Sequence, residues 1–314
     1  MESDNGSHAQ GLSQREPRPR GPRPRGPRVL LTDPLEGRSC LVTGATGGIG
    51  LEIARGLARR GAHVIIHGRT RSRAEAAATW VRTQVKGVRL EAVAADLSSL
   101  DAVREMAAEV QRRHHELDVL VNNAGVLMTR LELTREGYEM TFAVNHLAPF
   151  LLTNLLLEYL QRTGAGRVVT VASVAHRTGV IEFGNLKGEK GFSSFAFYCN
   201  SKLANIMFTM ELARRTDGTG VTANCFHPGA INTGLYRRSR IAALAFTVFG
   251  PFFPTAARGA DTAIYLAGAP GVADINGAYF ARRRMRRPSA QAFDAEVQQR
   301  LWQVSAEATG VGLP

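Results

Sequence analysis

Short β-rich runs alternate with amphipathic helical stretches from residue 37 onward. The runs cover residues 39–43, 63–67, 89–94, 118–122, 167–172, 221–226 and 277–280. Between two of them, residues 99–114 have apolar side chains at helical spacing, namely Leu100, Val103, Met106, Ala107 and Val110. Buried strands separated by helices are typical of a parallel sheet covered on both sides. The sequence therefore predicts an α/β fold with a doubly wound parallel sheet, in one domain over residues 37–314 that ends in a helix at 289–307.

Residues 1–36 have a different composition, rich in proline, arginine and glycine. The run "REPRPRGPRPRGPR" repeats itself and has no apolar side chains to bury. Such a segment cannot offset the entropy of folding by burying apolar surface. We expect a disordered or polyproline-like tail.

The formal net charge of +12 raises the possibility of nucleic-acid binding. Much of the excess lies in two local clusters, "RRSR" at 237–240 and "RRRMRR" at 282–287, which no recognition-helix pattern or aromatic platform accompanies. We expect no nucleic-acid partner and interpret the clusters as solvated surface. An acidic ligand or an anionic membrane surface remains the alternative.

The cysteine pattern and the length of the apolar runs indicate the cellular compartment. Cys40, Cys199 and Cys225 are scattered, with neither a disulfide framework nor a metal-binding spacing, which favours a reducing compartment and no metal. No uninterrupted apolar run reaches the roughly 20 residues that cross a bilayer, and no secretory signal is recognisable. We expect a cytoplasmic protein, with peripheral membrane contact through residues 237–254 as an open alternative and the oligomeric state undecided.

A glycine-rich turn, "TGATGGIG" at 43–50, joins the first predicted strand to a helix. Glycines at 44, 48 and 50 allow a tight turn, close approach of a diphosphate, and close helix–strand packing. The N-terminus of the following helix offers unpaired N–H groups to an anion. This context favours a dinucleotide site, and the alternative is a turn without a ligand.

The second predicted strand ends in "HGRTRSR". A site for NAD places an acidic residue here to bind the ribose hydroxyls, whereas this chain has Gly68 followed by Arg69. A guanidinium can pair with a ribose 2′-phosphate. The pattern favours NADP(H), although these arginines are also compatible with the start of a solvated helix.

Tyr198 and Lys202 lie four positions apart at the head of an apolar helical run. With Asn205 they form a row on a different face from the apolar stripe. Taken alone, such a pair also fits ordinary helix surface, so the rest of the chain has to decide its role.

Seven motifs occur in order: "TGATGGIG", "DL" at 96–97, "NNAG" at 122–125, "VNHL" at 144–147, "VAS" at 171–173, "YCNSK" at 198–202 and "HPGAI" at 227–231. The series resembles the short-chain dehydrogenase/reductase family over about residues 37–285. Finer features resemble its retinol dehydrogenase branch, among them "NNAGVLM", "HLAPFLLTNLLLEYL" and "SKLANIMFTMELARR".

The resemblance implies a role for each matching residue. Tyr198 would be the acid/base and Lys202 its activator, Ser173 would hold the substrate oxygen, and Asn145 would organise a proton-relay water. The cofactor residues it implies are Gly44, Thr46, Gly47, Gly48, Ile49, Gly50, Arg69, Asp96, Leu97, Asn123, Ala124, Gly125, Tyr198, Lys202, Pro228, Gly229 and Ile231.

Physical chemistry supports the tyrosine–lysine pair. A free tyrosine, with a pKa near 10, is a poor base at neutral pH. A lysine ammonium about 4 Å away contributes about 4 kcal/mol at an effective dielectric of ~20, or roughly three pKa units. We expect an NADP(H)-dependent oxidoreductase that interconverts a lipophilic aldehyde or ketone (retinoid-like, fatty aldehyde or steroid) and its alcohol. The alternative is a non-catalytic NADP(H)-binding sensor or scaffold on the same fold.

Two further segments carry expectations. The apolar run at 241–254 is interpreted as a lid that selects lipophilic ligands, with shallow membrane insertion as the alternative. Pro149 lies four residues after Asn145 and has no N–H to donate to the Asn145 carbonyl, so the helix should kink there.

Overall fold

The computed structural model describes residues 35–229 and 255–312. The chain divides into two units, Met1–Thr32 and Asp33–Pro314, and all described residues belong to the second. The segments 237–240 and 241–254, and Ile231, lie outside the described residues, as does the predicted tail except for its last two residues. One of these, Leu35, is fully buried and packs against Gly268. The ordered domain therefore extends upstream of the predicted boundary at residue 37, because Leu35 fills a space in the core.

Eight described strands form one sheet in the order β3-β2-β1-β4-β5-β6-β7-β8. All neighbouring pairs are parallel except β7 and β8. The strands are β1 Ser39–Val42, β2 His63–Gly68, β3 Leu90–Ala94, β4 Val119–Asn122, β5 Arg167–Val171, β6 Thr222–His227, β7 Tyr279–Ala281 and β8 Arg284–Arg286. The doubly wound parallel sheet is confirmed, and every predicted strand is present within two residues of its expected bounds.

The antiparallel strand β8 was not predicted. It pairs with β7 through a two-residue turn in which Arg282 and Arg283 have φ values of 52° and 58°. Positive φ at both positions is the geometry of a type I′ hairpin, which usually takes Asn-Gly. Here tertiary contacts hold it: the Arg283 guanidinium pairs with Asp261, and its N–H donates to Thr262 Oγ1. The arginine cluster interpreted as solvated surface is therefore partly a structured hairpin.

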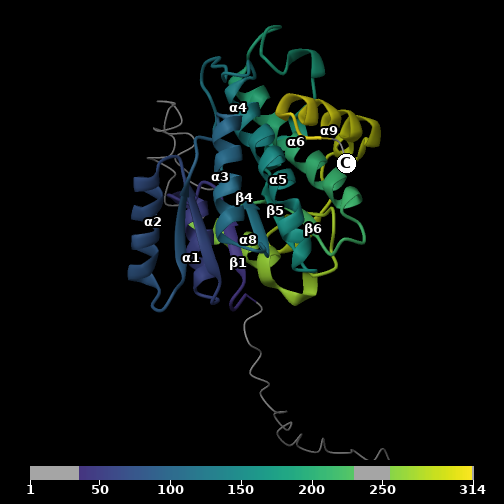
Figure 1. Ribbon diagram of the computed structural model, residues 1–314. Coiled ribbons are helices and arrows are strands. Elements are labelled where there is room, and N and C mark those ends of the chain that lie inside the picture. Colours follow the sequence, from purple (N-terminus) through teal and green to yellow (C-terminus); the bar gives the residue numbers. More distant parts are fainter. Residues whose placement is uncertain (1–34, 230–254, 313–314) are drawn as a thin grey trace, which may run out of the picture. The chain divides into compact units, whose positions relative to one another are not determined.

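Helices cover both faces of the sheet (Figure 1). One face packs against α1 Gly48–Ala58, α2 Arg71–Gln84 and α8 Ala256–Gly268. The other packs against α3 Leu100–Arg113, α5 Ala148–Arg162 and α6 Ser194–Arg215, and α9 Ala295–Thr309 packs against α6 and α5. The apolar stripe predicted for residues 99–114 is the buried face of α3. Shorter 3₁₀ turns lie at Val174–Thr178, Phe183–Asn185, Pro270–Val272 and Ala290–Phe293.

The helical segment before α5 contains a π-helical turn next to Pro149, the residue at which a kink is predicted. The short helix α4, Met140–Phe142, leads into a π-helical turn at Ala143–Leu147, where the N–H of Ala148 donates to the carbonyl of Ala143. A π turn adds one residue to the repeat and often occurs at functional sites. The whole segment Met140–Arg162 is long and apolar enough to cross a membrane, but 78% of its most apolar window is buried within the fold.

Candidate active site

The carboxyl ends of β1 and β4 lie side by side near the centre of the sheet. From β1 the chain proceeds outward through β2 and β3, whereas β4 and later strands extend the sheet in the other direction. In open α/β sheets this reversal leaves a crevice at the carboxyl ends, where ligands bind. The glycine-rich turn follows β1 and the "NNAG" motif follows β4, so both predicted groups meet there.

Two glycines of the turn are required by close packing. A Cβ on Gly44 would lie 2.8 Å from the Cα of Ala124. A Cβ on Gly50 would lie 2.4 Å from Nδ2 of Asn123. Any larger residue would therefore separate the turn from the end of β4.

Two other glycines border open space. Among the described residues, no atom lies within 4 Å of a Cβ built on Gly47 or Gly48. Gly47 immediately precedes α1, and no described side chain caps the N-terminus of this helix. Thr46 and Ile49, on either side of these glycines, are partly buried. Uncapped N–H groups beside open space fit the diphosphate of a dinucleotide.

Thr43 joins the turn to the "NNAG" loop. Its hydroxyl donates to the carbonyl of Val121 at 3.3 Å and accepts the N–H groups of Asn123 and Ala124 at 2.9 and 3.1 Å. Asn123 Nδ2 in turn donates to the Thr43 carbonyl at 2.8 Å. These hydrogen bonds hold the glycine-rich turn and the "NNAG" loop together at the base of the crevice.

The end of β2 excludes a large side chain. A Cβ on Gly68 would lie 2.6 Å from Cγ2 of Thr46, so the acidic residue typical of an NAD site would collide with the turn. Arg69 is exposed, and its Nε lies 3.8 Å from Oδ2 of Asp96. Leu97, the neighbour of Asp96, is buried. The predicted adenosine-binding residues are thus brought together.

The carboxylate of Asp96 is held in its charged form. Partial burial would raise its pKa, but hydrogen bonds from the N–H and hydroxyl of Ser98 and the nearby Arg69 guanidinium lower it below its ordinary value. Asp96 therefore offers an oxygen acceptor beside the guanidinium of Arg69.

His67, one residue before Gly68, is buried and supports the turn from below. Its Nδ1 accepts the N–H of Gly44 at 3.0 Å, and Nε2 lies 3.0 Å from the carbonyl of Ala95, to which it donates. These partners fix the neutral tautomer. Burial also lowers the pKa of this imidazole.

The row Tyr198, Lys202 and Asn205 on α6 is buried and faces the end of β5. Lys202 Nζ and Asn205 Nδ2 both donate to the carbonyl of Val171 at 3.2 Å. Nζ lies 5.7 Å from the centroid of the Tyr198 ring. Burial lowers the pKa of Lys202 to about 8.

Asn145 connects the π turn to both the "NNAG" loop and α6. Its Oδ1 accepts the N–H of Val126 at 2.7 Å, and Nδ2 donates to the Val126 carbonyl and to Ser201 Oγ at 3.0 Å each. A Cβ on Gly125 would lie 3.2 Å from Asn145 Oδ1 and 3.6 Å from Lys202 Nζ. Gly125 therefore lets the loop approach both side chains.

Ser173 follows β5 and is partly buried at the start of a 3₁₀ turn that packs against α6. Its carbonyl accepts Nδ1–H of the buried His176 at 2.6 Å, and Nε2 of His176 accepts the N–H of Ser289 at 3.1 Å. The histidine thus ties the serine backbone to the segment before α9.

After β6, Pro228 and Gly229 are partly buried, and Gly229 has φ 96°. Ile231 lies beyond the described residues.

This combination of sheet order, glycine turn and α6 row matches a known family. A family model described as short chain dehydrogenase matches residues 38–243. The chain belongs to the short-chain dehydrogenases. Members of this family are oxidoreductases whose fold binds a nicotinamide cofactor.

Named relatives place this short-chain dehydrogenase in the retinol dehydrogenase-like branch, as its motifs indicated. It is 42% identical over 277 residues to retinol dehydrogenase 12 of Homo sapiens, covering 88% of each chain. It is 40% identical over 287 residues to human retinol dehydrogenase 13, covering 89% of this chain and 87% of the relative.

Solved structures share the fold of this chain. A crystal structure of an uncharacterized protein from Mycobacterium Paratuberculosis superposes with a TM-score of 0.74 and 33% identity, over 90% of this chain and 97% of that one. A gluconate 5-dehydrogenase from Burkholderia cenocepacia, in complex with NADP and tartrate, has a TM-score of 0.64 and 26% identity, over 78% and 93% of the two chains.

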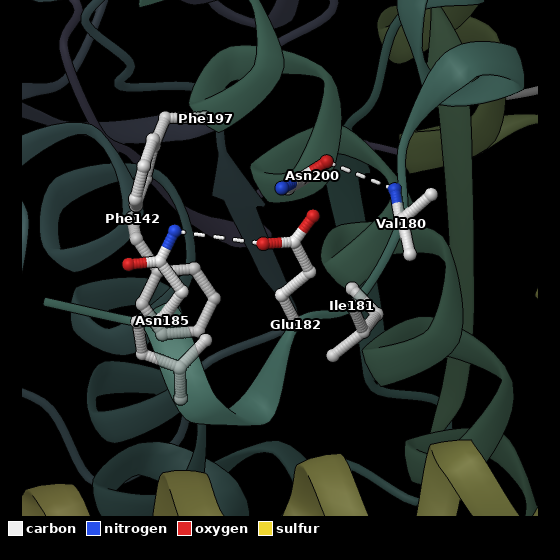
Figure 2. Close-up of a pocket in the computed structure, with 8 residues that line it drawn as sticks. Phe142, Val180, Ile181, Glu182, Asn185, Phe197 and Asn200 are labelled. Atoms are coloured by element: carbon white, nitrogen blue, oxygen red, sulfur yellow. Dashed lines mark hydrogen bonds between the residues drawn. The ribbon is translucent and has the colours of Figure 1, made fainter. Parts of the chain in front are cut away.

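This dehydrogenase also has a small pocket on another face of α6 (Figure 2). Phe142 and Phe197 lie on one side, and the Glu182 carboxylate lies between Asn185 and Asn200. Each residue advances about 100° around a helix, so Phe197 and Asn200 point away from the Tyr198 row. The pocket is therefore separate from the crevice.

Three residues that organise the site were not predicted from the sequence, namely Thr43, His67 and Ser201. Thr43 and Ser201 lie inside motifs, but the motifs did not indicate a contact for either side chain. A histidine ending the apolar run 63–67 was a usable signal of a buried polar contact. His176 contacts the Ser173 backbone locally and Ser289 at a long sequence separation.

Proposed function

We propose that this short-chain dehydrogenase is NADP(H)-dependent and interconverts a lipophilic aldehyde or ketone with its alcohol. The observation that carries the proposal is the buried Lys202 ammonium beside the Tyr198 ring, at the end of β5 where Ser173 follows. Burying an ammonium is unfavourable, so a fold retains it where the charge has a use.

In this proposal the residues divide the proton chemistry. Tyr198 gives a proton to the developing alkoxide in reduction and removes it in oxidation. Lys202 stabilises the tyrosinate and so lowers the Tyr198 pKa toward neutrality. Ser173 donates a hydrogen bond to the substrate oxygen, and Asn145 positions the loop beside Lys202.

The crevice fits a dinucleotide, whose nicotinamide would supply or accept the hydride when bound. The turn at Gly47 and Gly48 would hold the diphosphate, and Asp96 with Leu97 the adenine. Arg69, exposed and beside a position where only glycine fits, would pair with a 2′-phosphate. The gluconate 5-dehydrogenase structure, solved with NADP, supports this choice.

Apolar surface beside the site supports a lipophilic substrate. Phe195 lies one turn before Tyr198 on the same row and is 61% exposed. Val174, next to Ser173, is 51% exposed. The names of the retinol dehydrogenase relatives point to the same substrate class.

The test is Tyr198→Phe, with Tyr265→Phe on α8 as the matched control. The proposal expects NADPH turnover with retinoid, fatty and steroid carbonyls to be abolished in the first variant and retained in the second. NADPH binding should stay within about tenfold, since the ring still packs. Substantial residual turnover would reject Tyr198 as the acid/base. A wild type that binds NADPH but turns over no carbonyl would favour the scaffold function.

We further propose a cytoplasmic protein, with peripheral membrane contact through residues 237–254 as the alternative to a substrate lid. Flotation with liposomes tests this contact. Binding that requires anionic lipid and weakens with salt supports it, and the absence of binding rejects it.

A further inference from the structure

Two imidazoles flank one carboxylate at the edge of the sheet opposite the crevice. His63 Nε2 lies 3.0 Å from Oε1 of Glu91, and His114 Nε2 lies 3.3 Å from its Oε2. One ligand atom from each residue lies within 4.8 Å of the others. Within residues 35–229 and 255–312, this is the one group of three side chains with such an arrangement.

The fold dictates this meeting. Ile65 pairs with Glu91 in the parallel register of β2 and β3, so His63, two residues before Ile65, projects from the same face as Glu91. That face is covered by α3, whose buried side chains pack against Ile65. The helix runs back toward the amino ends of the strands and ends at His114.

The electrostatic surroundings permit a cation. The Glu91 carboxylate lies between the two imidazoles and supplies negative charge to the site. The nearest positive groups are Arg89 and Arg113. Arg113 lies 3.7 Å from Glu91 but makes its closer pair, 2.7 Å, with Glu109. Its guanidinium therefore pairs with both carboxylates, and more closely with Glu109.

We propose that His63, Glu91 and His114 form a zinc-binding site, with water as a fourth ligand. Two imidazoles and one carboxylate are a donor set that Zn²⁺ takes in proteins. Bonds of about 2.0–2.2 Å place tetrahedral ligand atoms roughly 3.4 Å apart, which side-chain rotation can reach from the present spacing. The site joins β2, β3 and α3 at the end of the sheet away from Tyr198, so its role is stability rather than catalysis.

The experiment uses the full, untagged chain after treatment with EDTA. Titration with zinc chloride in a calorimeter should show one tight site, and saturating zinc should raise the melting temperature by roughly 5 °C. His114→Ala and Glu91→Gln should each weaken zinc binding by at least about tenfold. His115→Ala removes the exposed neighbouring histidine and should leave binding unchanged.

NADPH binding reports folding in every variant, because the crevice is at the other end of the strands. The proposal is overturned if the wild type binds no zinc, or if variants that still bind NADPH retain wild-type zinc affinity. A loss of zinc binding in His115→Ala equal to that in His114→Ala also overturns it.

Discussion

The N–H of Gly44 donates to Nδ1 of His67 across 3.0 Å, which links the first residue of the glycine turn to the end of β2. Because this imidazole is buried and its other nitrogen bonds to the Ala95 carbonyl, it cannot rotate to find new partners. The His67 side chain therefore fixes the position of the turn without contacting the cofactor.

Removing this acceptor should loosen the turn. We expect His67→Leu to weaken NADPH binding about tenfold, because a buried N–H left without its partner costs about 1–3 kcal/mol. His67→Asn, whose Oδ1 can accept from Gly44, should keep most of the affinity. Fluorescence titration with NADPH measures both. Equal affinity of the two variants would mean that the bond to Gly44 has no influence on the turn.

Arg69 should determine the choice between NADPH and NADH. In Arg69→Ala we expect the ratio of kcat/KM for the two cofactors to fall by about 10- to 100-fold, since charge-assisted bonds contribute about 1.5–3 kcal/mol. Arg73→Ala, which removes another exposed guanidinium nearby, is the control. An unchanged ratio, or a wild type that prefers NADH, would contradict the assignment.

Lys202 should destabilise the fold that contains it. Its pKa falls from 10.5 to about 8 on folding, which corresponds to about 3 kcal/mol at neutral pH. The hydrogen bond from Lys202 to the Val171 carbonyl offsets about 1 kcal/mol of this cost. We therefore expect Lys202→Met to be inactive yet about 2 kcal/mol more stable at pH 7, measured by urea unfolding.

The contribution of Lys202 to the free energy of unfolding changes with pH in one direction. Between pH 8 and 10.5 the unfolded chain binds more protons at Lys202 than the folded chain, so this residue's contribution to stability rises with pH. The advantage of Lys202→Met should therefore shrink across that window. Lys187→Met, at an exposed lysine, should show no such trend. A variant that is less stable than wild type at pH 7 would refute the argument.

Phe195 should influence which substrates are preferred. It is 61% exposed, so Phe195→Ser should leave the free energy of unfolding nearly unchanged. The loss of apolar contact should raise KM for long-chain aldehydes by about 10-fold while short aldehydes are unaffected. Trp80→Ser, at an exposed aromatic residue on α2, is the control. Equal effects on long and short aldehydes would remove Phe195 from the substrate site.

The sequence by itself determined the parallel strands of the sheet and the order in which they occur. Buried strands have to be apolar, and α3 has to present Leu100, Val103 and Val110 on one stripe, so these signals are local and survive without a structure. The glycine turn and the Tyr198–Lys202 spacing are local in the same sense. The kink predicted at Pro149 rests on a local signal too, because a missing N–H is a property of the residue itself; the structure has a π turn at the adjacent residues.

Only the tertiary structure decided the contacts between elements. Whether Gly68 tolerates a side chain depends on Thr46, and the role of His67 depends on Gly44; both partners come from a different strand end. The Arg282-Arg283 turn contradicts local turn preference and is held by bonds from α8. Likewise, His63 and His114 meet at Glu91 through strand register and helix direction, which act across long sequence separations and leave no local signal.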